Sequence, residues 1–335
     1  MKAVVRTRYG PPEVLELDEI ELPVAKDDEV LVRVYAATVN RTDCANHRAK
    51  PFFMRLVIGL FKPKMKVPGT EFSGVIEAVG KRVSSLKPGE KVFGFDDEGS
   101  GSQAQYLTIR EDKAVTMPDG IDFEQAAASS EGMHYAYNFI NKVNIERGQY
   151  ALVNGATGAI GSAAVQLLKY YEVNVTAVCA TKNIELVKSL GANRVIDYTK
   201  EDFTEDDQTY SYVFDTVGKS SFFKCRKLLK PGGIYISSDL GYMSQNLFLP
   251  FITPIIKPLF GNRKTMFPVP VDIKRSLLLV KKLIEQGRFK AVIDRSFTLE
   301  EIVDAYRYVE TGEKTGNVVI TVSKEGRRQE FNATA

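Results

Sequence analysis

The chain has 335 residues, of which 44% are hydrophobic and 26% charged, the balance of a water-soluble globular protein with two domains. Its 45 basic and 42 acidic residues give a net charge of +3 and are mixed along the chain, which excludes a dedicated nucleic-acid-binding surface. The three cysteines, Cys44, Cys179 and Cys225, are scattered; they fit a reducing compartment and cannot supply a Cys-rich zinc lobe.

The apolar runs predict no integral membrane span. The N-terminal sequence from Met1 to Arg6 has too few apolar residues for a signal peptide. The longest apolar stretch, Leu247–Phe260, is interrupted by three prolines and by Lys257. We therefore expect a soluble, cytoplasmic protein.

Residues 1–122 are rich in strand-like runs, which are separated by turns that contain glycine, proline or aspartate. The predicted strands are Ala3–Thr7, Val14–Glu19, Glu29–Ala37, Gly74–Val79, Lys91–Phe95 and Ala104–Ile109. Phe123–Lys142 is predicted to be mostly helical. This part of the chain is therefore expected to form a β-rich domain, which the helical segment joins to the rest.

The most informative stretch is the glycine turn, residues 155–161. It consists of Gly155, Ala156, Thr157, Gly158, Ala159, Ile160 and Gly161. An apolar strand, Gln149–Asn154, precedes it, an amphipathic helix follows, and Val173–Cys179 completes a βαβ unit of the size that binds dinucleotides. Glycines let the backbone approach a pyrophosphate at the helix N-terminus, so we expect a dinucleotide site; a doubly wound domain without nucleotide is the alternative.

Strands and helices continue to alternate after this unit, as in a doubly wound parallel sheet. The predicted elements are helix Asn183–Leu190, strand Arg194–Tyr198, strand Ser211–Val217, helix Ser221–Leu229 and strand Ile234–Ser238. Beyond Pro270 they are helix Asp272–Glu285, a short strand at Val292–Ile293, a helix that begins with a capping box of Thr298 and Glu301, and strand Val318–Val322. The predicted fold class is therefore α/β.

The residues after the second strand of the βαβ unit indicate which dinucleotide is bound. An NAD site carries an acid there, whereas this chain has Thr181 and Lys182. A lysine at this place favours a ribose 2′-phosphate, and therefore NADP(H) as the cofactor. The alternative is that Lys182 is a solvated lysine at the start of a helix.

Six short motifs are distributed over nearly the whole chain. They are Val67–Ile76 (VPGTEFSGVI), Pro88–Val92 (PGEKV), Gly155–Gly161 (GATGAIG), Lys188–Ala192 (KSLGA), Val195–Tyr198 (VIDY) and Leu229–Gly233 (LKPGG). Together they resemble the medium-chain dehydrogenase/reductase superfamily. Within it the chain is similar to the zinc-independent quinone oxidoreductase, or zeta-crystallin-like, branch.

The resemblance implies a GroES-like β-rich catalytic domain, residues 1–122 completed by residues 288–335, and a Rossmann NADP(H)-binding domain, residues 123–287. It also implies a homodimer that uses NADPH to reduce quinones or α,β-unsaturated carbonyl compounds. Tyr198 matches a family tyrosine that lies near the adenine ribose and its 2′-phosphate. Val217 and Ser237 are predicted to end strands at the carboxyl edge of the sheet, where such sheets bind ligands.

The resemblance also bears on zinc. Zinc-dependent relatives place a cysteine near Asn40 and a histidine at the position of Thr70, and neither residue found here is a zinc ligand. Cys44 and His47 have a suggestive spacing but lack further partners. No metal is therefore expected, and hydride transfer is then most accessible to an acceptor that delocalises the charge itself, such as an enone, an enal or a quinone.

Asn40 is the predicted catalytic residue, because the family keeps an asparagine there beside the nicotinamide and the substrate. Its alternative role is to cap the backbone amides of Thr42 or Asp43.

The residues identify no proton donor. Some enoyl reductases and quinone reductases in this branch carry a tyrosine a few residues past the position of Asn40, whereas Ala45–Pro51 contains none. His47, His134 and Tyr135 lie nearby in sequence or in the family's active-site helix, and water is a further source of the proton.

Two segments, residues 51–60 and 246–260, are unusually apolar for loops and are flanked by basic residues. They are consistent with a buried core or a dimer contact, with the walls of a lipophilic substrate cleft, or with a peripheral membrane contact. The sequence leaves these alternatives open.

The function that the residues favour is NADPH-dependent, zinc-independent reduction of a quinone or an α,β-unsaturated carbonyl. One alternative is an NADP(H)-binding protein with a structural or RNA-binding role, as zeta-crystallin relatives can have. Another is a zinc-free alcohol dehydrogenase, which would lack a group to stabilise the alkoxide. No tyrosine is followed four residues later by a lysine, which excludes a short-chain dehydrogenase.

Overall fold

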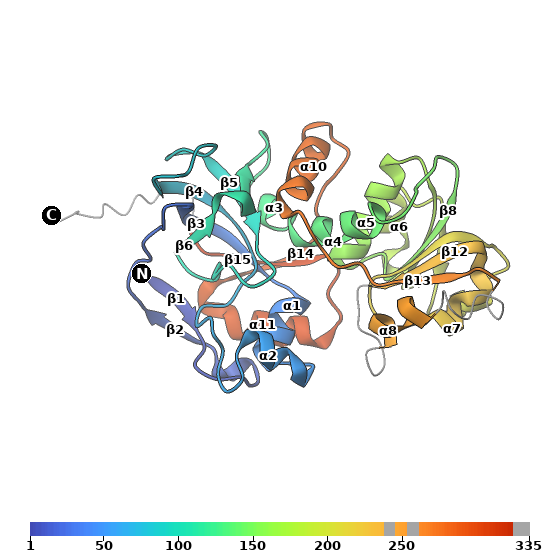
Figure 1. Ribbon diagram of the computed structural model, residues 1–335, viewed down its shortest axis with the longest axis horizontal. Coiled ribbons are helices and arrows are strands. Elements are labelled where there is room, and N and C mark those ends of the chain that lie inside the picture. The colour runs from blue at the N-terminus through green and yellow to red at the C-terminus, as the bar shows by residue number, and fades with distance from the viewer. Residues whose placement is uncertain (238–244, 253–260, 324–335) are drawn as a thin grey trace. The chain divides into compact units, whose positions relative to one another are not determined.

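The computed structural model describes residues 1–237, 245–252 and 261–323, which form two compact units (Figure 1). Unit 1 consists of Met1–Ser130 and of the chain from Ile293 on, and unit 2 is Glu131–Val292. These borders lie eight and five residues after the predicted domain borders at 122/123 and 287/288.

Unit 1 is built around a seven-stranded sheet with the order β14–β15–β3–β4–β5–β7, in which β6 also pairs with β3. All neighbours are antiparallel except β14 and β15, and β1 and β2 form a separate antiparallel pair. The strands are β1 (Lys2–Val5), β2 (Glu16–Glu19), β3 (Glu29–Val39), β4 (Glu71–Val79), β5 (Lys91–Phe95), β6 (Tyr106–Arg110), β7 (Ala114–Thr116), β14 (Ile293–Thr298) and β15 (Asn317–Thr321). The β-rich prediction for this part of the chain is confirmed.

Short helices connect the strands of unit 1. They are α1 (Arg41–Arg48), α2 (Arg55–Ile58), α3 (Phe123–Ala127) and α11 (Ile302–Thr311), with the 3₁₀ turns η1 (Pro12–Val14), η2 (Phe52–Met54), η3 (Glu111–Lys113) and η8 (Leu299–Glu301). Thr298 and Glu301 form the predicted capping box. The hydrophobic pattern does not predict α1, α2 or β7, because these elements are too short to show a clear period.

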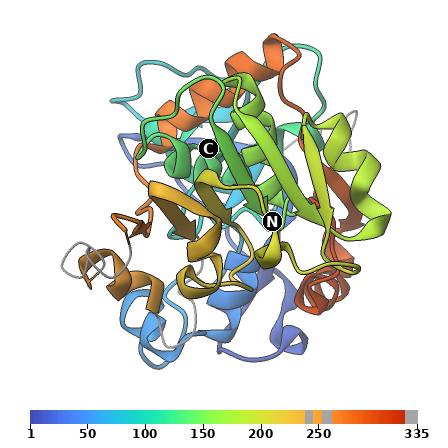
Figure 2. The same cartoon turned by 90° about the vertical axis from the view of Figure 1, so that its right-hand side faces the viewer.

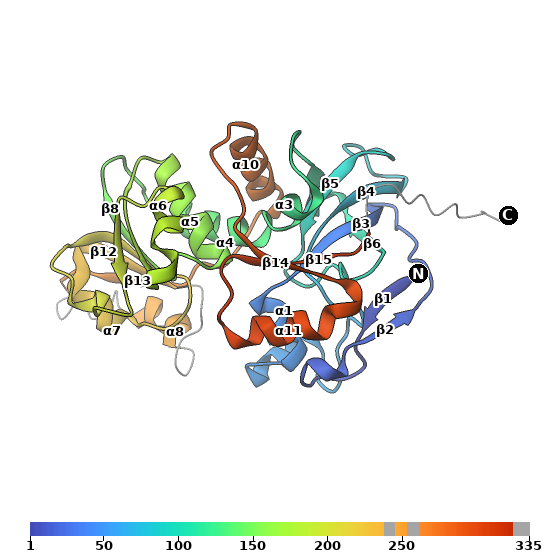
Figure 3. The ribbon, with the colours of Figure 1, turned by 180° about the vertical axis from the view of Figure 1, so that it is seen from behind.

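The central strand β3 is buried on both of its faces. Val30 and Val32 pack with Phe72 of β4 on one face. Val39 packs with Tyr306 of α11 on the other, where α11 lies beneath the sheet (Figure 3). Because β3 is enclosed on both sides, the chain that leaves its C-terminal end is held in a fixed position.

The predicted helix Phe123–Lys142 is two helices, α3 and α4 (Glu131–Ile140), and the border of the units lies between them. The Ser129 hydroxyl donates a hydrogen bond to the backbone oxygen of Gln125 (2.6 Å). Serine side chains compete in this way for backbone groups, which favours the end of a helix.

Unit 2 holds six parallel strands in the order β10–β9–β8–β11–β12–β13 (Figure 2). The strands are β8 (Tyr150–Asn154), β9 (Asn174–Cys179), β10 (Arg194–Asp197), β11 (Tyr210–Asp215), β12 (Leu229–Ser237) and β13 (Lys264–Met266). The chain runs from β8 outward to β10 and then returns to the other side of β8 with β11, so the order reverses between β8 and β11. The doubly wound parallel sheet of the predicted α/β fold class is confirmed, and ligands of such sheets bind at the carboxyl ends of the strands beside this reversal.

Helices cover both faces of this sheet. Phe214 of β11 stacks on Phe139 of α4, with 6.0 Å between ring centroids, whereas its neighbour Val213 packs with Phe222 on the opposite face. The helices are α4, α5 (Ala159–Tyr170), α6 (Ile184–Ser189), α7 (Phe222–Cys225), α8 (Gln245–Ile252) and α10 (Ile273–Glu285), with the 3₁₀ turns η4 (Thr181–Asn183), η5 (Phe203–Glu205) and η6 (Arg226–Leu228).

Three predictions for unit 2 differ from the structure. Strand β11 ends at Asp215, so Val217 lies in the loop after the strand and not at its end. The predicted helix Ser221–Leu229 is shorter, because Leu229 pairs with Tyr210 and so begins β12. Strand β13 was not predicted at all.

Parts of two predicted segments lie outside the described residues. They are Ser238 and residues 253–260 of the second apolar segment. Within the described part of the chain, no helix combines the length and the apolar composition that a bilayer crossing requires.

Candidate active site

Three polar residues end adjacent strands at the carboxyl edge of the parallel sheet. Asn154 ends β8, Asp215 ends β11 and Ser237 ends β12, and the register pairs Asp215 with both of the others. All three are buried. Because buried polar side chains need partners inside the protein, their contacts determine how the chain continues beyond the strands.

The fully buried Asp215 carboxylate accepts hydrogen bonds from two side chains and three backbone groups. The donors are Asn154 Nδ2 (3.0 Å), the backbone N–H groups of Val217 (3.4 Å), Gly218 (3.1 Å) and Ser220 (3.1 Å), and the Tyr235 hydroxyl (2.8 Å). Burial, and then the nearby Asp215, raise the pKa of Tyr235 far above its usual value, so this phenol stays a donor. The carboxylate therefore holds the loop of residues 216–220 and joins it to β8 and β12.

The glycine turn packs against this loop. Gly155 has a φ of 80°, a conformation that favours glycine, and a Cβ there would lie 2.3 Å from Cγ1 of Val217. A Cβ at Gly161 would lie 2.1 Å from the backbone oxygen of Gly155. A side chain at Gly155 would displace that of Val217, and one at Gly161 would require the backbone to move, so the two glycines allow the turn, the loop and the start of α5 to pack closely.

The N-terminus of α5 is the place where a pyrophosphate would bind. Its N-cap, Gly158, offers no side-chain cap, and the first amides of a helix have no acceptor within the helix. Ala156 is buried and donates its N–H to the backbone oxygen of Val178 (3.2 Å), whereas Thr157, Ala159 and Ile160 are partly exposed. The structure thus brings the predicted turn residues together and leaves uncapped amides that fit an anion.

The residues predicted to bind the 2′-phosphate lie at the ends of two neighbouring strands. Thr181 and Lys182 follow β9, Tyr198 follows β10, and the backbone N–H of Tyr198 donates to the oxygen of Cys179 (3.1 Å). Lys182 and Tyr198 are exposed. Within the described residues Lys182 forms no ion pair, so its ammonium group is available to a ligand.

Asp197, at the end of β10, orients this group of residues. Its carboxylate accepts hydrogen bonds from the hydroxyls of Thr181 and Thr199, and Lys200 Nζ lies 3.6 Å away. The two hydroxyls, and then Lys200, hold the pKa of Asp197 down at about 2, so it is charged at neutral pH. Since a phosphate here would lie near this negative charge, its binding would depend on Lys182.

Asn40 follows β3 in unit 1 and begins α1. Its Oδ1 accepts the N–H of Asp43 (2.8 Å), and the Asp43 carboxylate accepts the N–H of Asn40 (3.0 Å), which together form a capping box. Nδ2 of Asn40 donates to Thr70 Oγ1 (2.8 Å) and to Glu71 Oε2 (3.4 Å). The capping role considered as the alternative is therefore present in the structure, while a catalytic role for Asn40 stays a prediction.

Asp43 is completely buried beside these residues. Burial raises its pKa to about 7; the hydrogen bond from the N–H of Asn40 and the charge of Arg6 lower it, and the charge of Glu71 raises it. A buried group with such a pKa changes its charge within the physiological range.

The donor set of unit 1 does not fit a catalytic zinc. In the described ranges no group of three or more His, Cys, Asp or Glu side chains is placed to hold a metal ion. His47 Nε2 donates to the backbone oxygen of Pro11 (2.9 Å). Burial raises the pKa of the Cys44 thiol far above its usual value, which disfavours the thiolate that binds metal.

The side chains considered as proton donors have structural contacts. His134 is buried, with Nδ1 2.7 Å from the Ser276 hydroxyl, and its ring lies edge-on to that of Tyr135. His47 is buried edge-on against Tyr306, with 5.4 Å between ring centroids. These contacts do not single out a proton donor.

Three carboxylates that were not predicted as functional residues, those of Asp43, Asp197 and Asp215, hold these regions of the two units in place. The positions of these three acids relative to strand ends and to an N-cap are the signal that could have indicated them. Asp197 and Asp215 are the last residues of β10 and β11, where acids reach the carboxyl edge of a parallel sheet, and Asp43 stands three residues after an N-cap asparagine.

Two family models match the chain. The model described as "Alcohol dehydrogenase GroES-like domain" matches residues 26–119, and the one described as "Zinc-binding dehydrogenase" matches residues 190–320. The first match lies in unit 1, and the second runs from unit 2 into the last strand of unit 1.

Known relatives match almost the whole chain. The 2-methylene-furan-3-one reductase of Solanum lycopersicum is 34% identical over 96% of this chain and 79% of its own length. The chloroplastic NADPH-dependent alkenal/one oxidoreductase of Arabidopsis thaliana is 32% identical with the same coverage. The solved structure of the quinone oxidoreductase from Coxiella burnetii superimposes with a TM-score of 0.85 at 25% identity, covering 96% of this chain and 99% of that one.

Replacing Asp215 with alanine should lower the free energy of unfolding by roughly 3–5 kcal/mol, because buried donors lose their acceptor. The matched control, Tyr235→Phe, removes a single donor and should cost about 1 kcal/mol. Chemical denaturation measures both values. Similar losses in the two variants would mean that the carboxylate does not hold the loop.

Asp43 should make the stability depend on pH. Its pKa is about 7 in the folded chain and about 3.9 in the unfolded chain, so the folded chain holds the extra proton between these values. The stabilisation is complete below pH ~4 and is lost as the pH rises to ~7, a loss of up to roughly 4 kcal/mol.

Asp43→Asn keeps an acceptor for the N–H of Asn40 but cannot titrate. The difference in unfolding free energy between wild type and this variant should therefore change across that pH window, as measured by denaturant titration at several pH values. A difference that is constant with pH would mean that Asp43 does not titrate there.

Proposed function

The chain belongs to the medium-chain dehydrogenase/reductase superfamily, in its quinone oxidoreductase branch, and on this premise we propose that it reduces quinones or α,β-unsaturated carbonyl compounds with NADPH. Membership makes the protein an oxidoreductase. The names of two relatives, a 2-methylene-furan-3-one reductase and an NADPH-dependent alkenal/one oxidoreductase, support a conjugated carbonyl as the acceptor.

The observation that carries the proposal is the uncapped N-terminus of α5 against the glycine turn. Gly155 and Gly161 leave no room for side chains there, and Gly158 provides no competing cap. Uncapped amides at a helix N-terminus bind phosphate groups. The exposed Lys182 and Tyr198 at the adjoining strand ends support NADP(H) over NAD(H).

The proposed reaction balances without a metal. NADPH, when bound, supplies a hydride. A conjugated carbonyl would take this hydride at its β-carbon and a solvent proton at its α-carbon, which would leave the saturated carbonyl compound and NADP⁺. This acceptor spreads the negative charge itself, which suits a chain with Asn40 and Thr70 at the family's zinc positions.

In this proposal, residues of the chain bind the cofactor and hold the side chains of the site in position. The glycine turn binds the pyrophosphate, and the loop containing Val217, with Ser237 beside it, forms the cofactor-side edge of the sheet. Asn40, the predicted catalytic residue, holds the Thr70 hydroxyl through its amide (2.8 Å) and so acts as a positioning residue.

Lys182→Ala should weaken NADPH binding by about tenfold or more and leave NADH binding nearly unchanged, because only NADPH carries the 2′-phosphate that an ammonium group would bind. Fluorescence titration with each dinucleotide measures this. The control is Lys188→Ala, which removes an exposed lysine that pairs with Glu185 on the next helix. Equal weakening of both dinucleotides would show that Lys182 does not bind the 2′-phosphate.

The acceptor class is tested by following NADPH oxidation with a panel of 1,4-quinones, 2-alkenals and longer enones, with and without a chelator. We expect turnover with at least one of these classes and no effect of the chelator, because the described residues, 1–237, 245–252 and 261–323, offer no zinc donor set. A protein that binds NADPH but turns over none of them would contradict the proposal, and loss of activity with the chelator would contradict its metal-free chemistry.

A further inference from the structure

The apolar–basic segment, residues 50–66, exposes four large hydrophobic side chains within a stretch of ten residues. It leads from α1 through η2 and α2 towards β4. Phe52 is 71% exposed, Leu56 74%, Leu60 48% and Phe61 88%. Single exposed apolar residues are normal on a protein surface, whereas a cluster of this kind marks an interaction site.

The charge of the segment has one sign. Its basic residues are Lys50, Arg55, Lys62, Lys64 and Lys66, and it contains no acidic residue. Its charge of +5 therefore exceeds the net charge of +3 of the whole chain.

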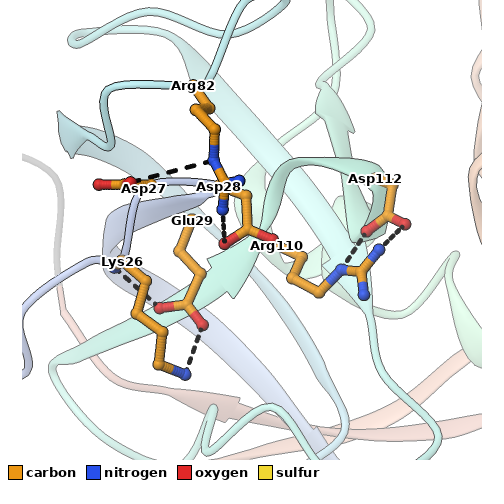
Figure 4. Close-up of polar contacts among 7 residues, drawn as sticks. All are labelled: Lys26, Asp27, Asp28, Glu29, Arg82, Arg110 and Asp112. Atoms are coloured by element: carbon orange, nitrogen blue, oxygen red, sulfur yellow. Dashed lines mark hydrogen bonds and ion pairs between the residues drawn. The ribbon is translucent and has the colours of Figure 1, made fainter.

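Several exposed cations elsewhere on unit 1 lie beside acids. Figure 4 shows the pairs Lys26–Glu29, Arg82–Asp27, Arg82–Asp28 and Arg110–Asp112. The four lysines of the segment, by contrast, are all exposed and form no ion pair within the described ranges of the chain. Their charges are available to an anionic partner.

The fold fixes the segment in this exposed arrangement. The Tyr9 hydroxyl donates to the backbone oxygen of Gly59 (2.7 Å), and the N–H of Lys64 donates to that of Ile58 (2.9 Å). The Arg55 guanidinium lies over the rings of Tyr9 and Phe52, 5.0 and 4.9 Å from their centroids. Gly59 has a φ of 125°, and a Cβ there would lie 2.1 Å from the oxygen of Lys62, so the turn depends on glycine.

We propose that the apolar–basic segment docks the protein onto an anionic lipid bilayer. Its apolar side chains enter the interface, and its lysines contact the negatively charged headgroups, the combination that interfacial membrane binding requires. A second copy of the chain fits this surface less well than a bilayer does. A twofold interface would place the segment's positive charge against itself, and lysine is depleted in the cores of protein interfaces.

Co-sedimentation of the full chain with vesicles tests whether binding depends on the lysines of the segment. We expect binding to phosphatidylcholine vesicles that contain phosphatidylserine, weaker binding at high salt, and little binding to phosphatidylcholine alone. The double variant Lys62→Glu with Lys64→Glu should bind at least about tenfold more weakly. The control, Lys81→Glu with Lys87→Glu, makes the same charge change at exposed lysines elsewhere on unit 1 and should bind like wild type. Equal losses in both variants would overturn the proposal, because net charge alone would then explain binding.

The fluorescence of an introduced tryptophan tests whether the apolar side chains enter the bilayer. The chain has no tryptophan of its own that would interfere. Phe61→Trp provides a single reporter, whose emission should shift to the blue when phosphatidylserine vesicles are added. Val24→Trp, at an exposed position outside the segment, should show no shift. A Phe61→Trp reporter that stays in water on bound vesicles would overturn the proposal.

Two further outcomes would show that the segment contacts a second copy of the chain or the substrate instead of a bilayer. If Phe61→Ser converts a dimer to a monomer and wild type binds no vesicles, the segment is a contact between copies of the chain. If Phe61→Ser leaves vesicle binding unchanged and raises the KM of a long-chain enone, the segment belongs to the substrate site. Vesicle binding is measured without cofactor or substrate, so its failure is independent of the proposed reductase function.

Discussion

The buried carboxylate of Asp215 is the constraint on which the ligand-binding edge of unit 2 depends. A buried charge costs several kcal/mol unless it is fully hydrogen-bonded, and this one has five donors from β8, β12 and its own loop. Any other conformation of residues 216–220 would withdraw donors from it. The loop in turn places Val217 where a side chain at Gly155 would stand, so the glycine turn is fixed as well. The edge is therefore formed before a ligand arrives, which lowers the entropy cost of binding.

Unit 1 shows the same principle in the residues around Asn40. Asn40 bonds to Asp43, Thr70 and Glu71, and Glu71 also accepts the hydroxyl of Thr38 (2.5 Å). Polar groups that are buried together and satisfy one another hold a unique arrangement. This set of side chains is thus held by hydrogen bonds, which also fix the Thr70 hydroxyl.

The sequence predicted the elements whose pattern is local and missed the contacts that are not. The glycine turn and the strands β8 and β9 were predicted because glycine spacing and apolar runs are visible in a short window. Asp215 was missed because its partners Asn154 and Tyr235 are far away in the chain and meet it only in the sheet. For Asn40 the sequence offered both a catalytic and a capping role, and only the position of Asp43 in α1 shows the cap. The apolar run at residues 51–60 could equally have been core, since exposure depends on what the rest of the chain covers.

The central claim, that Asp215 holds the loop and the glycine turn in place before any ligand binds, is tested most directly by amide hydrogen exchange. In the free protein the N–H groups of Val217, Gly218 and Ser220, which donate to Asp215, should exchange slowly for a surface loop. On addition of NADPH, residues 155–161 should gain protection with little further change at residues 216–220. Fast exchange at these three amides in the free protein, with protection appearing only when NADPH binds, would contradict the account.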